Sequence, residues 1–102
     1  MITIFTPTYN RAYIIGNLYK SLLVQTSKDF EWLIVDDGST DDTETLVSSF
    51  IKENKIAICY IKQQNGGKHK AINRGVEEAK GDLFFIVDSD DYLSQDAVEK
   101  LS

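Results

Sequence analysis

The chain has 102 residues, of which 42% are hydrophobic and 26% charged; this composition is typical of one small globular domain and excludes long disorder. The formal net charge of −5 and a pI near 4.7 argue against a nucleic-acid-binding protein, which needs a basic face. The acidic residues concentrate in two segments, 36–44 and 88–99, and this local acidity favours cation binding over a solubilising surface.

The cysteine count and the apolar runs indicate a cellular compartment. Cys59 is the only cysteine, so the chain forms no internal disulfide, which fits a reducing compartment. No run of 18 apolar residues occurs and the N-terminus leads directly into strand-like sequence, so we expect neither a signal peptide nor a membrane span. A cytoplasmic protein is therefore expected.

Short apolar runs alternate with amphipathic segments along the whole chain. The runs are rich in β-branched and aromatic residues, as strands are, and span residues 2–6, 30–35, 56–61 and 83–87. The amphipathic segments have helical spacing and span residues 12–25, 41–51, 68–80 and 94–102. Asn10 is the predicted N-cap of the first helix. Ile51 and Val76 are predicted on the inner faces of the second and third helices.

Strands that alternate with helices imply right-handed crossovers and a parallel sheet. The predicted fold class is α/β, a Rossmann-like doubly wound sheet of βαβαβαβα order with strand order 3-2-1-4. Ligands of such sheets bind beyond the carboxyl ends of the strands. Polar clusters follow the four strands, at Pro7–Asn10, Asp36–Ser39, Gly66–Lys68 and Asp88–Asp91. We therefore expect these clusters to converge on one edge of the sheet.

The fourth apolar run, Leu83–Val87, has the composition of a strand buried on both faces, and it leads into three carboxylates, Asp88, Asp90 and Asp91. Like charges at the edge of a core repel one another unless a cation lies between them. Hard oxygen ligands suit Mg²⁺ or Mn²⁺, so this segment predicts a divalent metal site. The alternative is a solvated turn that caps the last helix.

Features of an anion site accompany these acids. Gly66 and Gly67 allow the backbone to approach a ligand closely, and the helix N-termini after the loops attract anions. Lys68, Lys70 and Arg74 form the only tight basic cluster of an acidic chain. Carboxylates that hold a metal, near groups that hold anions, suggest a metal-bridged diphosphate.

Two residues suit a nucleotide base. Tyr9 offers a flat face on which a base can stack, and Asp37 offers an acceptor for the N–H edge of that base. The alternative is that Tyr9 is a core aromatic and Asp37 forms a turn.

Four motifs in order resemble the start of a family 2 glycosyltransferase of the GT-A fold. They are Thr6–Asn10 (TPTYN), Val35–Asp41 (VDDGSTD), Asn65–Gly67 with Asn73–Gly75 (NGG and NRG), and Asp88–Asp91 (DSDD). Each motif is weak alone, but four at natural spacing across nearly the whole chain are specific. The resemblance implies a truncated GT-A fold and transfer of a sugar from a nucleotide diphosphate, usually UDP, to an acceptor hydroxyl with inversion.

The resemblance also implies a role for each site residue on the nucleoside side. Pro7 and Tyr9 would contact the base, and Asp37 would contact the edge of the base. Asp88 would contact the ribose.

On the diphosphate side, the resemblance implies that Asp90 binds Mn²⁺ or Mg²⁺, with Asp91 as a close rival. Lys68 lies in a loop where the family places groups near the nucleotide. The general base of the family lies downstream, in an acceptor-binding half that we expect beyond Ser102. Residues 1–102 are therefore expected to form a donor-binding domain that binds nucleotide-sugar without turnover.

Two further partners are expected. Many members of the family build cell-surface polysaccharides, so the resemblance implies peripheral attachment of the full enzyme at the cytoplasmic face of a membrane. The fourth strand would lie at an open edge of the sheet, and its apolar sequence predicts self-association through that edge.

Two other functions stay open. A non-catalytic α/β module could use the same acidic edge to bind a partner or a metal, and nucleotide binding distinguishes it from a transferase. A sugar nucleotidyltransferase shares the architecture, but it has a glycine-rich loop after the first strand, which this chain lacks.

Overall fold

Each of the four predicted apolar runs forms a strand followed by a helix in the computed structural model, which describes residues 1–101. The elements are β1 (Ile2–Thr8), α1 (Ile15–Leu23), β2 (Phe30–Asp36), α2 (Thr43–Glu53), β3 (Ile58–Lys62), α3 (Lys68–Glu78), β4 (Leu83–Ile86) and α4 (Ala97–Leu101). The predicted βαβαβαβα order is confirmed. Within residues 1–101, no helix combines the length and the apolar surface needed to cross a membrane.

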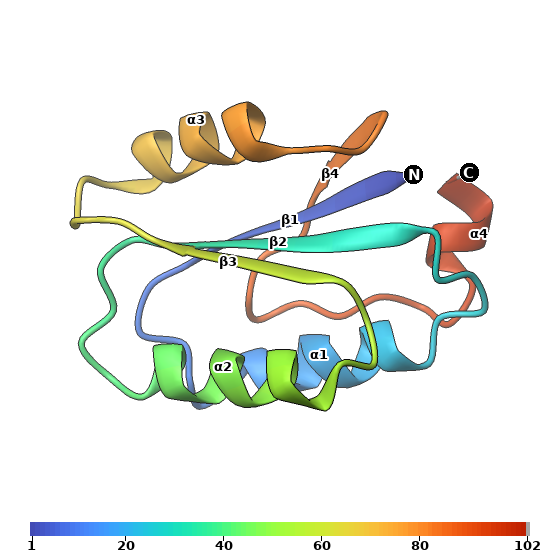
Figure 1. The fold of residues 1–102 in the computed structure, drawn as a ribbon, viewed down its shortest axis with the longest axis horizontal. Coiled ribbons are helices and arrows are strands. Elements are labelled where there is room, and N and C mark those ends of the chain that lie inside the picture. Colours follow the sequence, from blue (N-terminus) through green and yellow to red (C-terminus); the bar gives the residue numbers. More distant parts are fainter. Residues whose placement is uncertain (102) are drawn as a thin grey trace.

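The four strands form one parallel sheet in the order β3-β2-β1-β4, which confirms the predicted order. Helices α1 and α2 cover one face of the sheet and α3 covers the other (Figure 1). Since the crossovers on the two sides of β1 use opposite faces, the topology predicts a ligand site at the carboxyl ends of β1 and β4.

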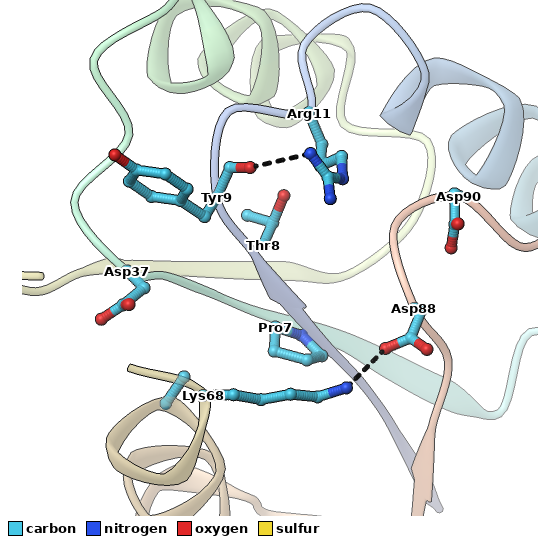
Figure 2. Close-up of a pocket in the computed structure, with 9 residues that line it drawn as sticks. Pro7, Thr8, Tyr9, Arg11, Asp37, Lys68, Asp88 and Asp90 are labelled. Atoms are coloured by element: carbon cyan, nitrogen blue, oxygen red, sulfur yellow. Dashed lines mark hydrogen bonds and ion pairs between the residues drawn. The ribbon is translucent and has the colours of Figure 1, made fainter. Parts of the chain in front are cut away.

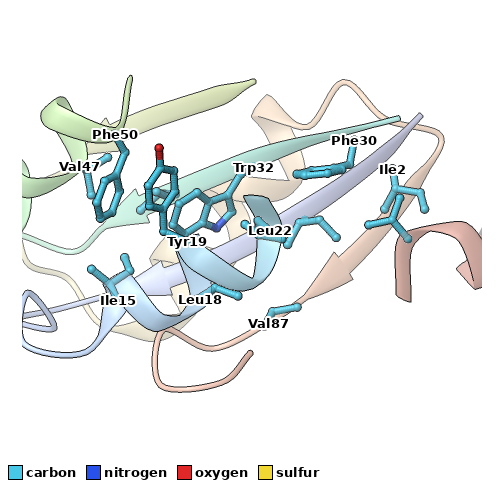
Figure 3. Close-up of a cluster of buried hydrophobic side chains, with 13 residues drawn as sticks. Ile2, Ile15, Leu18, Tyr19, Leu22, Phe30, Trp32, Val47, Phe50 and Val87 are labelled. Atoms are coloured by element: carbon cyan, nitrogen blue, oxygen red, sulfur yellow. The ribbon is translucent and has the colours of Figure 1, made fainter. Parts of the chain in front are cut away.

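β2 is buried on both faces, which explains its run of four apolar residues, Trp32–Val35. Trp32 and Ile34 pack in the cluster beneath α1 and α2 (Figure 3), whereas Leu33 and Val35 pack with Ala71 of α3. None of the four β2 side chains has any exposed surface. Burial of such side chains contributes roughly 1.5–3 kcal/mol each, so β2 firmly anchors the loop that follows it.

The inner face of α3 is formed by the small residues Ala71 and Gly75, because this helix lies very close to the sheet. A Cβ atom on Gly75 would lie 2.3 Å from Cε1 of Phe5. The predictions that Ile51 and Val76 face inward are wrong, since these side chains are 41% and 61% exposed. Each follows directly after a residue that faces the sheet, Phe50 or Gly75, and one further residue turns a helix by about 100°.

Asn10 does not cap α1, contrary to the prediction. The helix begins only at Ile15, and the residue at its N-cap makes no side-chain capping bond. Asn10 has a left-handed backbone (φ 52°), and its Oδ1 accepts hydrogen bonds from the amides of Thr40 (2.8 Å) and Asp41 (3.2 Å). Its side chain therefore ties the loop after β1 to the loop after β2.

β4 lies at an edge of the sheet. Its sequence alone predicts a strand buried on both faces, and this prediction is wrong. Leu83, Phe85 and Ile86 are 38–50% exposed. Among the described residues β4 pairs only with β1, so its second edge has no strand beside it. The open edge expected for the fourth strand is therefore present.

We expect this edge to make the chain self-associate, because unpaired backbone groups on an apolar edge strand are a template for pairing with another chain. Light scattering should give a mass above the 11.5 kDa of the monomer. Phe85→Lys, which places a charge on the edge, should shift the protein to monomer. A clean monomer of the unaltered chain at high concentration would contradict this expectation.

Candidate functional site

A pocket of about 300 Å³ opens at the carboxyl ends of the strands (Figure 2). Its lining comes from the end of β1 and the loop after it, the loops after β2 and β4, and the start of α3. The lining residues are Pro7, Thr8, Tyr9, Arg11, Asp37, Lys68, Ala71, Asp88 and Asp90. The polar clusters that follow different strands thus converge on one edge, as the sequence predicts.

Six of the seven predicted site residues line this pocket, and Asp91 is the one that does not. Two lining residues with polar side chains, Thr8 and Arg11, were missed by the sequence analysis. Thr8 lies inside the TPTYN motif and Arg11 follows it directly, so their position near Tyr9 could have been inferred. The direction of their side chains could not be inferred, because it depends on the conformation of the loop.

The pocket has two chemically different ends. Figure 2 shows Tyr9 and Asp37 at one end, and Asp88 and Asp90 at the other. Tyr9 is 43% exposed, so it is not a core aromatic. An aromatic face with an acceptor at one end, and clustered carboxylates at the other, can bind a ligand with an aromatic group and a metal-bound anion.

The adjacent acids at the end of β2 have different environments. Asp36 is completely buried and accepts hydrogen bonds from the Ser39 amide (2.8 Å) and the Tyr60 hydroxyl. Burial and this hydrogen bond to Asp36 raise the pKa of the Tyr60 hydroxyl, which therefore stays protonated as a donor. Asp36 holds the turn after β2, while the amide of Asp37 donates to the Thr8 carbonyl at 2.9 Å.

The carboxylate of Asp37 is bound by the loop between β3 and α3. Its Oδ1 accepts hydrogen bonds from Gln63 Nε2 (3.0 Å) and the Gly66 amide (2.9 Å), and its Oδ2 accepts one from the Gly67 amide (2.9 Å). The anion site predicted at Gly66 and Gly67 is therefore filled by the chain's own carboxylate. A carboxylate has about four acceptor positions, so one on Oδ2 is left for a ligand.

These contacts make stability depend on pH. Burial alone would raise the pKa of Asp37, but the hydrogen bonds from Gln63, Gly66 and Gly67 outweigh burial and lower it. A lowered pKa in the folded state stabilises the fold above the unfolded pKa, near 4, and this stabilisation is lost as the pH falls toward the folded pKa. We expect the free energy of unfolding to decrease between pH 5 and pH 3, and to decrease less in Asp37→Asn. Urea unfolding at both pH values tests this, and equal pH slopes for the two proteins would contradict it.

Asp88, Asp90 and Asp91 form a carboxylate cluster directly after β4. The segment is a turn in which the Asp91 amide donates to the Asp88 carbonyl at 3.0 Å. One oxygen of each carboxylate lies within 4.8 Å of the others. Hard divalent ions lie about 2.0–2.6 Å from their oxygen ligands, so oxygens on opposite sides of an ion are about 4–5 Å apart. The three carboxylates therefore fit one divalent ion.

Lys68 extends across the pocket from the start of α3, and its Nζ lies 3.6 Å from Oδ1 of Asp88 (Figure 2). The two side chains are 64% and 49% exposed, so the ion pair contributes only about 0–1 kcal/mol. Lys68 can therefore exchange Asp88 for an anionic ligand at little cost. Of the other two residues in the predicted basic cluster, neither Lys70 nor Arg74 lines the pocket.

Comparisons with known proteins give a consistent family. The sequence profile described as Glycosyl transferase family 2 matches residues 3–102. Glycosyltransferase GlyA from Streptococcus pneumoniae is 38% identical over 100 residues, which cover 98% of this chain and 14% of GlyA. Crystallised TarS from S. aureus, in complex with UDP-GlcNAc, is similar with a TM-score of 0.91 and 33% identity, over 98% of this chain and 29% of the TarS chain.

A second solved structure extends the comparison. The mannosyltransferase PcManGT from Pyrobaculum calidifontis, in complex with GDP-Man and Mn²⁺, has a TM-score of 0.88 and 27% identity, over 95% of this chain and 30% of its own. The chain spans 10–40% of the length of eight curated relatives that it matches. The profile covers almost every residue, and the sheet is that of the GT-A neighbours. The chain therefore belongs to glycosyl transferase family 2.

Proposed function

We propose that residues 1–102 form the donor-binding domain of an inverting glycosyltransferase, which transfers a sugar from a nucleotide diphosphate, in particular UDP, to an acceptor hydroxyl. The observation that carries this proposal is the convergence of Tyr9, Asp37 and the carboxylates after β4 on one pocket. Family membership supports it, as do two structural neighbours that hold nucleotide-sugars, TarS with UDP-GlcNAc and PcManGT with GDP-Man.

The nucleoside end of the pocket is formed by Pro7, Tyr9 and Asp37. The exposed ring of Tyr9 provides the stacking surface for the base, and Pro7, near the end of β1, lines the same pocket. Asp37 has one acceptor position left on Oδ2. Uracil has a single N–H on its pairing edge, so it matches this position, whereas guanine presents two kinds of donor there. Asp88, which lines the same pocket, is the proposed ribose contact.

The diphosphate end is formed by the carboxylates and Lys68. Asp90, with Asp91 as a close rival, would hold Mn²⁺ or Mg²⁺, since both belong to the carboxylate cluster that fits one hard divalent ion. A divalent ion held by these residues would offset the charge that develops on the nucleotide diphosphate leaving group. Lys68 supplies a mobile positive charge to the same group once it is released from Asp88.

Calorimetric titration of UDP into the chain, with and without Mn²⁺, tests the proposed function. We expect saturable heat in the presence of Mn²⁺ and much weaker binding without it. UMP, which lacks the second phosphate, should bind more weakly than UDP, and GDP should bind more weakly because of its base. A protein that is folded by circular dichroism and shows no metal-dependent heat with UDP would contradict the proposal.

A further inference from the structure

We propose that Arg11 and Thr8 bind the diphosphate of the donor, from the wall of the pocket that faces Lys68. This inference rests on the proposed function and deepens it, because the preceding assignment uses neither residue. It is carried by their place in the pocket, by the unmatched charge of Arg11 and by the unpartnered hydroxyl of Thr8.

Arg11 and Thr8 lie between the two ends of the pocket. Figure 2 shows Tyr9 and Asp37 on one side of them and Asp90 on the other, with Lys68 across the pocket. A nucleotide whose base lies at Tyr9, and whose metal ion lies at Asp90, must pass its phosphates between these points. The phosphates are therefore flanked by Lys68 on one wall and Arg11 on the opposite wall.

Arg11 is the cation of the pocket that has no carboxylate partner among the described residues. Lys68, the other lining cation, already pairs with Asp88. The only polar contact of the Arg11 guanidinium within residues 1–101 is a long hydrogen bond, 3.4 Å, from Nη1 to the Tyr9 carbonyl. An arginine has five N–H donors in a planar fork that matches two phosphate oxygens, so four of these donors are available to a ligand.

The charges of the pocket favour this role for Arg11. The carboxylates of Asp88, Asp90 and Asp91 carry three negative charges. One divalent ion and Lys68 together carry three positive charges, so this end of the pocket has no net charge. A diphosphate brings about two more negative charges into this neutral site. Arg11 makes the diphosphate end positive, and charge-assisted hydrogen bonds to an oxyanion are the strong class of such bonds.

Thr8 provides the second, independent observation. Its side chain is 4% exposed, and its Oγ1 is the one buried side-chain polar atom within residues 1–101 that has no hydrogen-bond partner. Figure 2 shows the hydroxyl directed toward the Arg11 side of the pocket. A buried hydroxyl without a partner is destabilising, and a phosphate oxygen would accept a hydrogen bond from it.

The test compares UDP and UMP binding, measured by calorimetry with Mn²⁺, in the unaltered chain and in Arg11→Ala. We expect Arg11→Ala to weaken UDP binding about tenfold or more and to narrow the difference between UDP and UMP. Arg11→Lys, which keeps the charge but loses the fork, should give an intermediate affinity. UDP binding within about twofold of the unaltered chain in Arg11→Ala would overturn the role of Arg11 and leave the proposed function standing.

Arg74→Ala is the matched control, because it removes the same charge from the only other arginine of the chain. Arg74 lies outside the pocket and pairs with Glu78 at 3.3 Å. UDP affinity should be unchanged in this variant, and an equal loss in both variants would show a general effect of net charge and overturn the inference. Absence of UDP binding by the unaltered chain would overturn both the proposed function and this inference.

Thr8→Val separates a binding role from a structural one. Valine has the shape of threonine but no hydroxyl, so removal of an unpartnered group should leave the urea midpoint unchanged or raise it. UDP binding should nevertheless weaken about threefold or more, and Thr8→Ser should keep both properties. A lower urea midpoint with unchanged UDP affinity would overturn the assignment of Thr8.

Discussion

Asp90→Ala is expected to abolish the Mn²⁺ dependence of UDP binding while the domain stays folded. Asp90 is exposed, so its truncation removes no core contact. It is, however, both a member of the carboxylate cluster and a lining residue of the pocket. Changes to residues that merely support metal ligands cost about 10–100-fold in metal affinity, so loss of a ligand should cost at least as much. Calorimetry with and without Mn²⁺ measures the effect, and circular dichroism reports the fold.

Two further variants sharpen this experiment. Asp82→Ala removes another exposed carboxylate, at the opposite end of β4, and should leave Mn²⁺-dependent binding unchanged. Asp91→Ala should have a smaller effect than Asp90→Ala, because Asp91 belongs to the cluster but does not line the pocket. Full metal dependence in Asp90→Ala would rule out the metal role of this residue.

Trp32→Ala is expected to have the largest effect on stability, about 3–5 kcal/mol. The Trp32 ring is fully buried and stacks with Tyr19 and Phe50, with centroid distances of 6.1 and 6.3 Å (Figure 3). Its Nε1 donates to Thr6 Oγ1 at 2.9 Å. Truncation leaves a cavity and an unpartnered hydroxyl, in a domain whose total stability is typically about 5–15 kcal/mol. Urea unfolding should be followed by circular dichroism, because the variant lacks the only tryptophan of the chain and cannot be followed by tryptophan fluorescence.

Two variants serve as references for Trp32→Ala. Tyr92→Ala truncates an aromatic side chain that is 75% exposed and should change the free energy of unfolding by at most about 0.5 kcal/mol. Trp32→Phe keeps much of the ring contact but leaves the Thr6 hydroxyl unpaired, so it should cost about 1–3 kcal/mol. A Trp32→Ala variant within 1 kcal/mol of the unaltered chain would contradict the packing described here.

The strands and their order could be predicted because local sequence and topology agree. β2 contains the apolar run Trp32–Val35 since helices cover both its faces, and alternation with helices requires parallel strands. The exposure of β4 does not follow from its own residues, which are those of a buried strand; it follows from its position in the sheet. The inner faces of α2 and α3 depend on how each helix is rotated, so Ile51 and Val76 were misplaced.

The site was predictable as a set of residues but not as a network. The rule that ligands bind at strand ends selects Tyr9, Asp37 and Asp90 without knowledge of any contact. It does not show that the Gly66 and Gly67 amides bind Asp37, because that requires the path of the loop after β3. Asn10 was taken for a helix cap for the same reason: its partners are 30 residues away along the chain.

The central place of β1 in the sheet has a consequence for synthesis. Ile2 pairs with Phe30 on one side and with Leu83 on the other. At about 5–20 residues per second, a ribosome completes β4 some 4–16 s after β1. During that interval one edge of β1 lacks its neighbour, and non-local parallel pairing of this kind folds slowly. The nascent chain therefore exposes β1 to chaperones until β4 has been made.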